Sequence, residues 1–485
     1  MTNYHSFQQN KYISYSIIAG LFLLACYSTY YYNINPNNAS LEYVSVLGLF
    51  SIVQFIYTLY SWYKVNRTLF DAYTIFTLAL YAFNVSQPIL EALGLSVGFR
   101  RLWGGFGISY ANYFTATYFA LVCLIFFHIG ALLSLAKQKK AAYGEQTVAS
   151  GQIIALRNVA LLFCLFSAFF YLRDLLEQMI IVTQFGYVGI YEIEYTSRTS
   201  AILGDMFPPS LLALYCSSLL LRKNELIMTA LVFMLLFLPP LYIGGRSNAM
   251  IVAAIFLIVY ATIRNINLKK FIMIAAASIA LLFVMNIVGQ TRASEGRSSN
   301  TWREAAKEAD NPIISTIQEM GWSMYPLALS IEAIPEKKDY SYGTSYFWAM
   351  VSCIPNIGFW SGTHPGKKHD PGTWLNKYSS ENYGVGYSMT AGVWNEFGPF
   401  GFLLMLMYGF IFCKFFSNVS KKNALYRPIQ FVFAILFLWY SIKFVRNSFD
   451  SFTRQLVFYM LPLYIITQYV YQNNKQKWLR HVKTT

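Results

Sequence analysis

The sequence predicts an all-α polytopic membrane protein that crosses the bilayer about twelve times and carries one large loop on the outer face. Apolar residues make up 56% of the chain and charged residues only 12%, roughly half the charge expected of a soluble protein. Apolar runs near 20 residues long recur from end to end, and Lys/Arg clusters follow every second run. These observations together favour a bundle of membrane-spanning helices.

Each apolar run is long enough for a helix to cross the hydrocarbon core, which takes about 20 residues. The expected spans are residues 12–31, 42–63, 69–93, 112–136, 158–180, 204–221, 225–243, 248–263, 271–289, 398–413, 428–445 and 455–472. The first run lacks a charged segment before it and a small-residue cleavage site after it. We therefore expect it to remain as an anchor.

Basic residues set the expected orientation. With the N-terminus in the cytoplasm, clusters such as 137–140, 222–223 and 421–422 all fall on the cytoplasmic side, opposed chiefly by Glu145 and Glu225. This asymmetry is the positive-inside pattern of membrane proteins, and it places both termini in the cytoplasm. The net charge of +15 is therefore a topology signal, and no nucleic-acid partner is expected.

One connection is much longer than the others. Residues 290–397 separate nine expected spans in residues 1–289 from three in residues 398–485, and they lie on the outer face. Long loops of this kind are usually functional. An amphipathic helix is expected near the start of this loop, lying on the membrane or on the bundle, with a bend or an end at Pro326. Its apolar positions are Ile313, Ile317, Met320, Met324 and Leu327.

Several cations fall on the outer face, where the topology rule does not explain them. They are Arg198, Arg246, Arg292, Arg297, Lys443, Arg446 and Arg454. Arginine near the membrane is costly unless it is paired or functional, and its planar fork suits phosphate. Arg246 follows Gly244 and Gly245, which would let a ligand approach the backbone. The alternatives are snorkelling to the interface or pairing with acids such as Asp450 and Glu295.

Two polar sites in the second half of the outer loop are candidates for chemistry. The run from His364 to Asp370 includes His369 and two lysines; its spacing matches no metal-ligand pattern, so we expect no metal. It is either a solvated turn or a contact for sugar or pyrophosphate. Glu396, at the start of the tenth span, is either a general base or hydroxyl partner, or a cap at the positive end of the helix dipole.

Common nucleotide and hydrolase motifs are absent from the sequence. We find no phosphate-binding P-loop, no glycine-rich dinucleotide fingerprint, no HExxH and no GxSxG, and no cytoplasmic segment is long enough for a nucleotide-binding domain. The six cysteines form no disulfide or metal-binding pattern. Any reaction is therefore expected to need no cofactor and to use an activated, lipid-linked substrate on the outer face.

The chain resembles the Wzy-type O-antigen or oligosaccharide repeat-unit polymerases. The resemblance is carried by the twelve-span plan with one late outer loop, the Gly-Gly-Arg turn at 244–246, and the segments 342–346 and 354–355. It is also carried by the Gly-x-Gly-Tyr-Ser…Asn-Glu-Phe-Gly-x-x-Gly run at 384–401. In one departure, Gly392 stands where relatives often have Glu, and Glu396 stands where Asn is commoner.

The resemblance implies a bundle similar to GT-C-like, lipid-carrier-dependent glycosyltransferases in the bacterial inner (plasma) membrane. It implies that undecaprenyl-pyrophosphate-linked oligosaccharides are polymerised into a surface polysaccharide of O-antigen, common-antigen or capsule type. A separate chain-length-regulating co-polymerase is a possible partner.

The reaction implied by this resemblance needs three kinds of residue. Candidates for acid–base chemistry are Glu396, His364 and His369. Candidates for holding pyrophosphate are Arg246, Arg292, Arg297, Lys443, Arg446 and Arg454. Candidates for holding sugars are Trp374, Tyr383, Tyr387, Trp394 and Asn395.

Three other functions stay open from the sequence. A lipid-linked oligosaccharide flippase or other transporter would favour charges deep in many spans, internal repeats and no large outer loop, which this sequence does not show. An O-antigen ligase would share the lipid donor and the outer loop and differ mainly in its acceptor. A non-catalytic scaffold would tolerate loss of every arginine in the outer loop.

Overall fold

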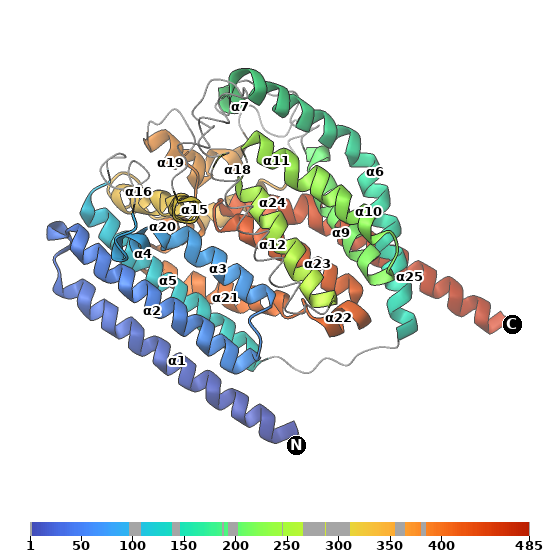
Figure 1. The fold of residues 1–485 in the computed structure, drawn as a ribbon, viewed down its shortest axis with the longest axis horizontal. Helices are drawn as coiled ribbons and strands as arrows, with labels where there is room; N and C mark the ends of the chain where they lie inside the picture. Colours follow the sequence, from blue (N-terminus) through green and yellow to red (C-terminus); the bar gives the residue numbers. More distant parts are fainter. Residues whose placement is uncertain are drawn as a thin grey trace. The chain divides into compact units, whose positions relative to one another are not determined.

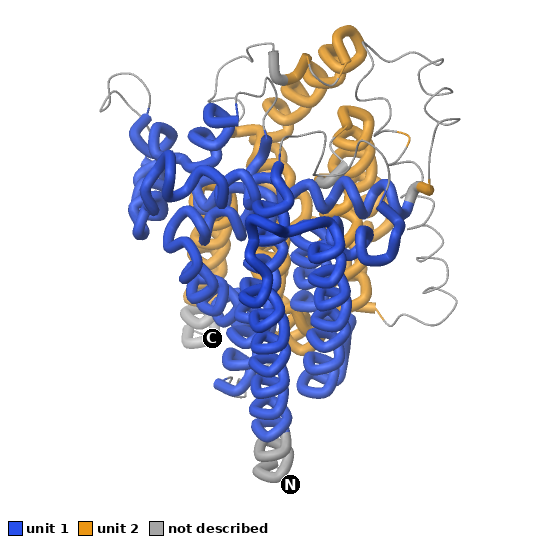
Figure 2. The backbone as a smooth tube through the Cα atoms, turned by 90° about the vertical axis from the view of Figure 1, so that its left-hand side faces the viewer, with its two compact units in different colours: residues 1–140, 313–417, 441–453 blue, residues 141–312, 418–440, 454–485 orange. Residues whose placement is uncertain are grey.

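The computed structural model describes residues 2–96, 108–137, 146–186, 189–192, 202–244, 246–264, 287, 311–354, 364–379 and 385–484. Every secondary-structure element in these residues is a helix, in agreement with the predicted fold class (Figure 1). The chain forms two compact units, each assembled from segments far apart in the sequence (Figure 2). Unit 1 comprises residues 1–140, 313–417 and 441–453, and unit 2 comprises residues 141–312, 418–440 and 454–485.

Unit 1 contains the N-terminal helices and most of the expected outer loop. Its elements are α1 (Thr2–Asn33), η1 (Pro36–Asn38), α2 (Leu41–Asn66), α3 (Ala72–Asn84), α4 (Ser86–Ala92), α5 (Tyr110–Ala136), α15 (Pro312–Met320), η5 (Gly321–Met324), α16 (Tyr325–Ala333), α17 (Thr344–Val351), α18 (Pro365–Lys368), α19 (Pro371–Ser379), α20 (Met389–Phe397), η6 (Gly398–Gly401) and α21 (Phe402–Phe416). Helix α5 is the centre of this unit, because α1, α2, α16 and α21 all pack against it.

Two glycines bring α5 and α21 into close contact. A Cβ atom added at Gly409 would lie 1.9 Å from the carbonyl oxygen of Phe127, and one added at Gly130 would lie 2.0 Å from that of Leu406. No side chain larger than hydrogen fits at either position. Small residues that let backbones approach are typical of helix pairs in membranes, where van der Waals contact drives association.

The segment for which an amphipathic helix is expected is helical and packs against α3, α4 and α5. It consists of α15 and α16, separated by the turn η5, and Pro326 stands in the first turn of α16. The side chains of Ser86 and Gln87 donate to the carbonyl oxygens of Ile317 (2.9 Å) and Gln318 (2.8 Å). These two hydrogen bonds fix α15 directly onto the α3–α4 junction.

Unit 2 is built around the long helix α6. Its elements are α6 (Gln146–Phe185), α7 (Gly189–Glu192), α9 (Phe207–Leu221), α10 (Glu225–Val232), η3 (Phe233–Phe237), α11 (Leu238–Ile243), α12 (Arg246–Ile263), α22 (Lys421–Tyr426), most of α23 (Pro428–Phe444), the end of α24 (Phe449–Gln455), η7 (Leu456–Met460) and α25 (Leu461–Thr484). Helix α6 contacts α9, α11, α22 and α25. Leu175, Val182 and Ile243 form a small core at the α6–α11 contact.

Among the residues that the structure describes, seven helices are long and apolar enough to cross a membrane. They are Gln9–Asn33, Leu41–Asn66, Tyr110–Ala136, Ser150–Phe185, Ile202–Leu221, Glu225–Ile243 and Met389–Phe416, and each contains one of the predicted spans. Shorter apolar helices, Ala72–Asn84, Asn248–Ile263 and Pro428–Phe444, overlap three more predicted spans. The predicted span 455–472 runs through η7 and α25, and the span 271–289 lies outside the described residues, apart from residue 287. The chain is therefore a multi-pass membrane protein.

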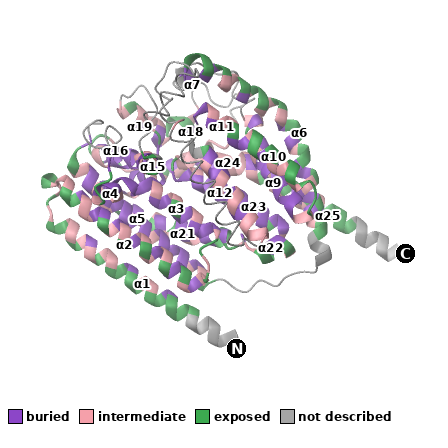
Figure 3. Cartoon of the chain, viewed as in Figure 1, coloured by how far each residue is buried: buried purple, intermediate pink, exposed green. Residues whose placement is uncertain are grey.

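Burial differs among these helices in the way a membrane protein requires. Helix α5 is buried along most of its length, whereas α1 exposes apolar side chains such as Ile18 and Phe22 (Figure 3). Apolar side chains left exposed on a helix of this length are expected to face lipid.

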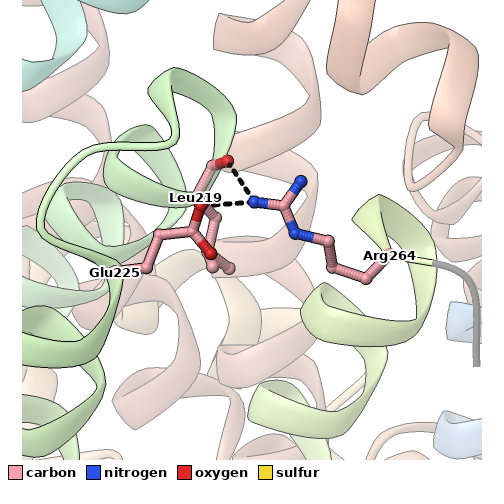
Figure 4. A network of polar contacts seen from close by, with 3 residues as sticks. All are labelled: Leu219, Glu225 and Arg264. Atoms are coloured by element: carbon pink, nitrogen blue, oxygen red, sulfur yellow. Dashed lines mark hydrogen bonds and ion pairs between the residues drawn. The ribbon is translucent and has the colours of Figure 1, made fainter.

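An ion pair joins two helices of unit 2. Arg264, at the end of α12, donates to the carboxylate of Glu225 and to the carbonyl oxygen of Leu219 (3.3 Å) (Figure 4). Both side chains belong to clusters that the charge pattern assigns to the cytoplasmic side. The pair is partly open, with 22% of the Arg264 side chain and 34% of the Glu225 side chain exposed.

Replacing Glu225 with glutamine is expected to reduce stability only slightly. Partly exposed ion pairs contribute less than about 1 kcal/mol, because water and salt screen them. The thermal unfolding midpoint of the purified variant, compared with that of the parent protein at low and high salt, measures this effect. A large drop that salt does not diminish would contradict the prediction.

Candidate functional site

In unit 1, the segment before α17 pairs with the end of α20. The backbone N–H groups of Ser341 and Tyr342 donate to the carbonyl oxygens of Asn395 (2.8 Å) and Glu396 (3.0 Å). The segment thereby satisfies carbonyls that a helix end leaves without intrahelical partners. Gly398 ends α20 with a φ of 55°, and a Cβ there would lie 2.5 Å from the ring of Tyr340. Only glycine fits both this conformation and this contact.

Glu396 lies fully buried at the centre of this junction. Its carboxylate accepts hydrogen bonds from the backbone N–H of Gly343 (2.6 Å), from the hydroxyl of Ser345, and from the side-chain amide of Asn395 (3.2 Å). A buried carboxylate needs such donors, since burial without them is very costly. Glu396 therefore holds the segment leading into α17 against α20.

Asn395 extends the junction to a lysine. Its side-chain amide donates to the hydroxyl of Ser341 (2.9 Å), and its Oδ1 accepts from the ammonium of Lys338 (2.9 Å). The ammonium also stands 4.8 Å from the ring centre of Trp374. Burial lowers the pKa of the Lys338 amine, while the carboxylates of Glu396 and Asp370 act in the opposite direction.

A cavity of about 450 Å³ opens beside this junction. It is lined by Lys338, Asp339, Tyr340, Ser341, Thr344, Ser345, Lys368, His369, Asp370 and Trp374. Ser345 thus faces the cavity and also donates to Glu396, so the buried carboxylate reaches the cavity through that hydroxyl. The lining combines cations, carboxylates, hydroxyls and an aromatic ring, which suits a polar ligand of small-molecule size.

The two loop histidines differ in their surroundings. His369 lines the cavity and stacks on Trp348, with ring centres 4.6 Å apart. His364 begins α18; its Nδ1 accepts from the N–H of Gly366 (3.0 Å), so its Nε2, 3.0 Å from the carbonyl oxygen of Ile354, carries the proton. The imidazole of His364 thus fixes the turn, and only His369 faces the cavity.

The predicted sugar-binding residues differ in their position relative to the cavity. Trp374 lines the cavity and stacks on Tyr378. Trp394 is buried, donates to the carbonyl oxygen of Ile334 (3.4 Å), and packs edge-on against Phe119. Tyr383 lies outside the described residues.

Tyr387 is buried close to the junction. Burial, followed by the carboxylates of Asp370 and Glu396, raises the pKa of its hydroxyl. That hydroxyl has no hydrogen-bond partner among the described residues. Tyr387 and Asn395 are therefore placed behind the cavity lining, next to the residues that form it.

The side chains of three of the six predicted pyrophosphate-binding cations are described, and they belong to different units. Lys443 and Arg446 belong to unit 1, where the guanidinium of Arg446 stands 5.3 Å from the ring centre of Phe83. Arg454 belongs to unit 2, and its Nε is buried without a hydrogen-bond partner among the described residues. Arg246 begins α12, but its side chain is outside the described part, as are Arg292 and Arg297 entirely.

Sequence reasoning missed Lys338 and Ser345 as site residues. Ser345 lies within the segment 342–346 that was singled out, but nothing local indicated that it would meet Glu396. Lys338 stands in a charged stretch of the sequence with no motif, and only the folded chain brings it to Asn395 and to the cavity.

Long apolar helices in both units define a multi-pass membrane protein, and unit 1 carries a polar cavity that is a candidate ligand site. The family model for the O-antigen polysaccharide polymerase Wzy matches residues 12–476, nearly the whole chain, and the chain belongs to this family. No curated protein and no solved structure matches it. The chain is thus a bacterial membrane polymerase that joins O-antigen-type repeat units supplied as lipid-linked oligosaccharides.

Proposed function

We propose that this chain polymerises undecaprenyl-pyrophosphate-linked oligosaccharide repeat units into a surface polysaccharide of O-antigen, common-antigen or capsule type. The growing glycan is transferred from its lipid pyrophosphate to the incoming repeat unit. The match of the Wzy family model over residues 12–476 is the observation that carries this proposal. The cavity beside Glu396 supports it, because the lining offers hydroxyl, carboxylate and ammonium groups to a sugar.

In the proposed reaction, a hydroxyl of the incoming unit attacks the anomeric carbon of the growing glycan. A new carbon–oxygen bond forms, the bond to the lipid pyrophosphate breaks, and the hydroxyl proton passes to a base. Glu396 is the proposed base and acts through Ser345, whose hydroxyl lines the cavity and donates to its carboxylate. His369 is the second choice, since it faces the same cavity, and His364 follows it.

The leaving pyrophosphate needs positive charge near it as the bond breaks. We assign this role to the outer-face cations Arg246, Arg292, Arg297, Lys443, Arg446 and Arg454. Trp374, Tyr383, Tyr387, Trp394 and Asn395 are proposed to hold or frame the sugars. No cofactor is needed in this scheme, because the energy of the new bond comes from the lipid pyrophosphate, and no metal is needed, because the arginines supply the positive charge.

The charge pattern supports an orientation for this reaction. We place the chain in the inner (plasma) membrane with both termini in the cytoplasm, since basic clusters such as 137–140 and 421–422 gather on one side. The cavity then belongs to the periplasmic face. A chain-length-regulating co-polymerase is the proposed protein partner.

The test is polymerisation by the purified protein in lipid nanodiscs, supplied with a lipid-pyrophosphate-linked repeat unit and no nucleotide. We expect a ladder of products on a gel. Arg246→Ala is expected to reduce the ladder about 100-fold or more, in line with the loss of a charge contact to a leaving group. The matched control is Arg222→Asn, because Arg222 has a φ of 55° that asparagine tolerates.

Each other outcome points to a different function. A ladder that persists in Arg246→Ala keeps the polymerase and removes Arg246 from the pyrophosphate site. Transfer of the glycan to a non-repeat acceptor instead would indicate a ligase. Movement of the lipid across a liposome membrane without any transfer would indicate a flippase.

A further inference from the structure

Lys338 places a positive charge at the cavity, and not all of its N–H donors are used within the protein. Its ammonium donates to Asn395 Oδ1 (2.9 Å) and stands against the ring of Trp374. An ammonium group has three N–H donors, so two are left for a ligand. The side chain lines the cavity, where such a ligand would lie.

Neighbouring carboxylates do not neutralise this charge by direct contact. Within the described residues, no carboxylate lies within ion-pairing distance of the Lys338 ammonium. Glu396 interacts with the Lys338 charge through space, but its carboxylate accepts hydrogen bonds from Gly343, Ser345 and Asn395. Asp370 caps the start of α19 through its Oδ2, which accepts from the N–H and the hydroxyl of Thr373, while its Oδ1 makes no hydrogen bond within the described residues.

The position of the ammonium is fixed before any ligand arrives. Trp374 stacks on Tyr378 with ring planes 13° apart, and the hydroxyl of Tyr378 donates to Glu332 (3.3 Å). The ring that faces Lys338 is therefore held by α16 and α19 together. A partly buried cation that no carboxylate contacts directly is costly, and a preorganised one gains most when an anion binds.

We propose that Lys338 binds an oxyanion carried by the substrate, so that the cavity takes an anionic group together with the sugar that bears or adjoins it. This inference rests on the proposed function, which supplies the substrate class. The oxyanion has two possible sources: a carboxylate on a sugar of the repeat unit, or the pyrophosphate of the lipid carrier. The cavity volume of about 450 Å³ is sufficient for one substituted sugar.

The test uses calorimetry to measure the equilibrium binding of three probes to the full chain in nanodiscs. The probes are methyl glucuronide, methyl glucoside and inorganic pyrophosphate. Lys338→Met is expected to weaken oxyanion binding roughly tenfold to a hundredfold, the usual loss for one hydrogen bond to a charged group. Lys337→Met is the matched control, because Lys337 is the exposed neighbour and does not line the cavity.

The arms of this experiment separate the two sources. Tighter binding of glucuronide than of glucoside, lost in Lys338→Met, assigns the site to a sugar carboxylate. Pyrophosphate binding that depends on Lys338, with no preference for glucuronide, assigns it to the carrier. Oxyanions that bind no better than glucoside, or that bind Lys338→Met as well as the parent protein, would overturn the proposal.

Because this assay measures binding alone, it is independent of polymerisation. A chain that binds an oxyanion at Lys338 yet makes no glycan ladder would refute the proposed function and keep the binding site. A chain that makes a ladder, but whose oxyanion binding does not depend on Lys338, would keep the proposed function and refute the binding site.

Discussion

Replacing Glu396 with alanine is expected both to destabilise unit 1 and to abolish the product ladder. The change leaves three donors without their acceptor: the N–H of Gly343, the hydroxyl of Ser345 and the amide of Asn395. Each buried donor left unsatisfied costs about 1–3 kcal/mol, so the total loss should be roughly 3 kcal/mol or more. The thermal unfolding midpoint and the ladder of the purified variant measure the two effects.

Glutamine at the same position separates anchoring from chemistry. Glu396→Gln keeps the shape and one accepting oxygen, so it should lose less stability than alanine, but an amide takes up no proton. A well-folded Glu396→Gln protein without a ladder would support a role in proton transfer. One that makes a normal ladder would limit Glu396 to holding the segment before α17. Glu336→Gln is the control, since Glu336 is exposed and does not line the cavity.

Membrane helices were the part of the fold most accessible from the sequence. Length and hydropathy are local properties, so runs such as 42–63 and 112–136 could be placed without knowing what they pack against. The end of the regular α-helix before Pro326 was also predictable, because proline disfavours a helix interior and is tolerated in a first turn, where it lies in α16. By contrast, the run 69–93 is divided into α3 and α4 at Val85, and hydropathy shows no sign of that division.

The cavity could not be predicted because it depends on contacts distant in the sequence. Glu396 meets Ser345, 51 residues earlier, and Asn395 meets Lys338, 57 residues earlier. A single carboxylate at the start of a span is compatible with a cap, a base or an anchor, and only its three donors show the anchoring contact. The residue patterns around Lys338 and Ser345 are ordinary for a polar loop, so they carried no local signal.

Replacing Gly409 with alanine is expected to separate the two central helices of unit 1. The new methyl group would start 1.9 Å from the carbonyl oxygen of Phe127, and ordinary contact needs about 3.4 Å or more. The obstacle is backbone, which cannot rotate away, so α5 and α21 must move apart and lose contacts along their length. Overpacking of this kind costs about 1–3 kcal/mol, occasionally more, and should lower the thermal unfolding midpoint.

Gly392→Ala is the matched control, because its Cβ would lie 3.6 Å from the ring of Tyr387, an ordinary contact. Within α20, alanine should even favour the helix by up to about 1 kcal/mol. An equal drop in both variants would contradict the close-contact explanation.

Gly130→Ala offers a second test of the same contact, since its Cβ would lie 2.0 Å from the carbonyl oxygen of Leu406. If one methyl group already forces α5 and α21 apart, the second meets less resistance. The double variant should therefore lose less stability than the sum of the two single variants. Strict additivity would show that the two glycines act on separate parts of the helix pair. Because α21 continues from α20 through η6, separation of the pair should also disturb the junction at Glu396 and reduce the ladder.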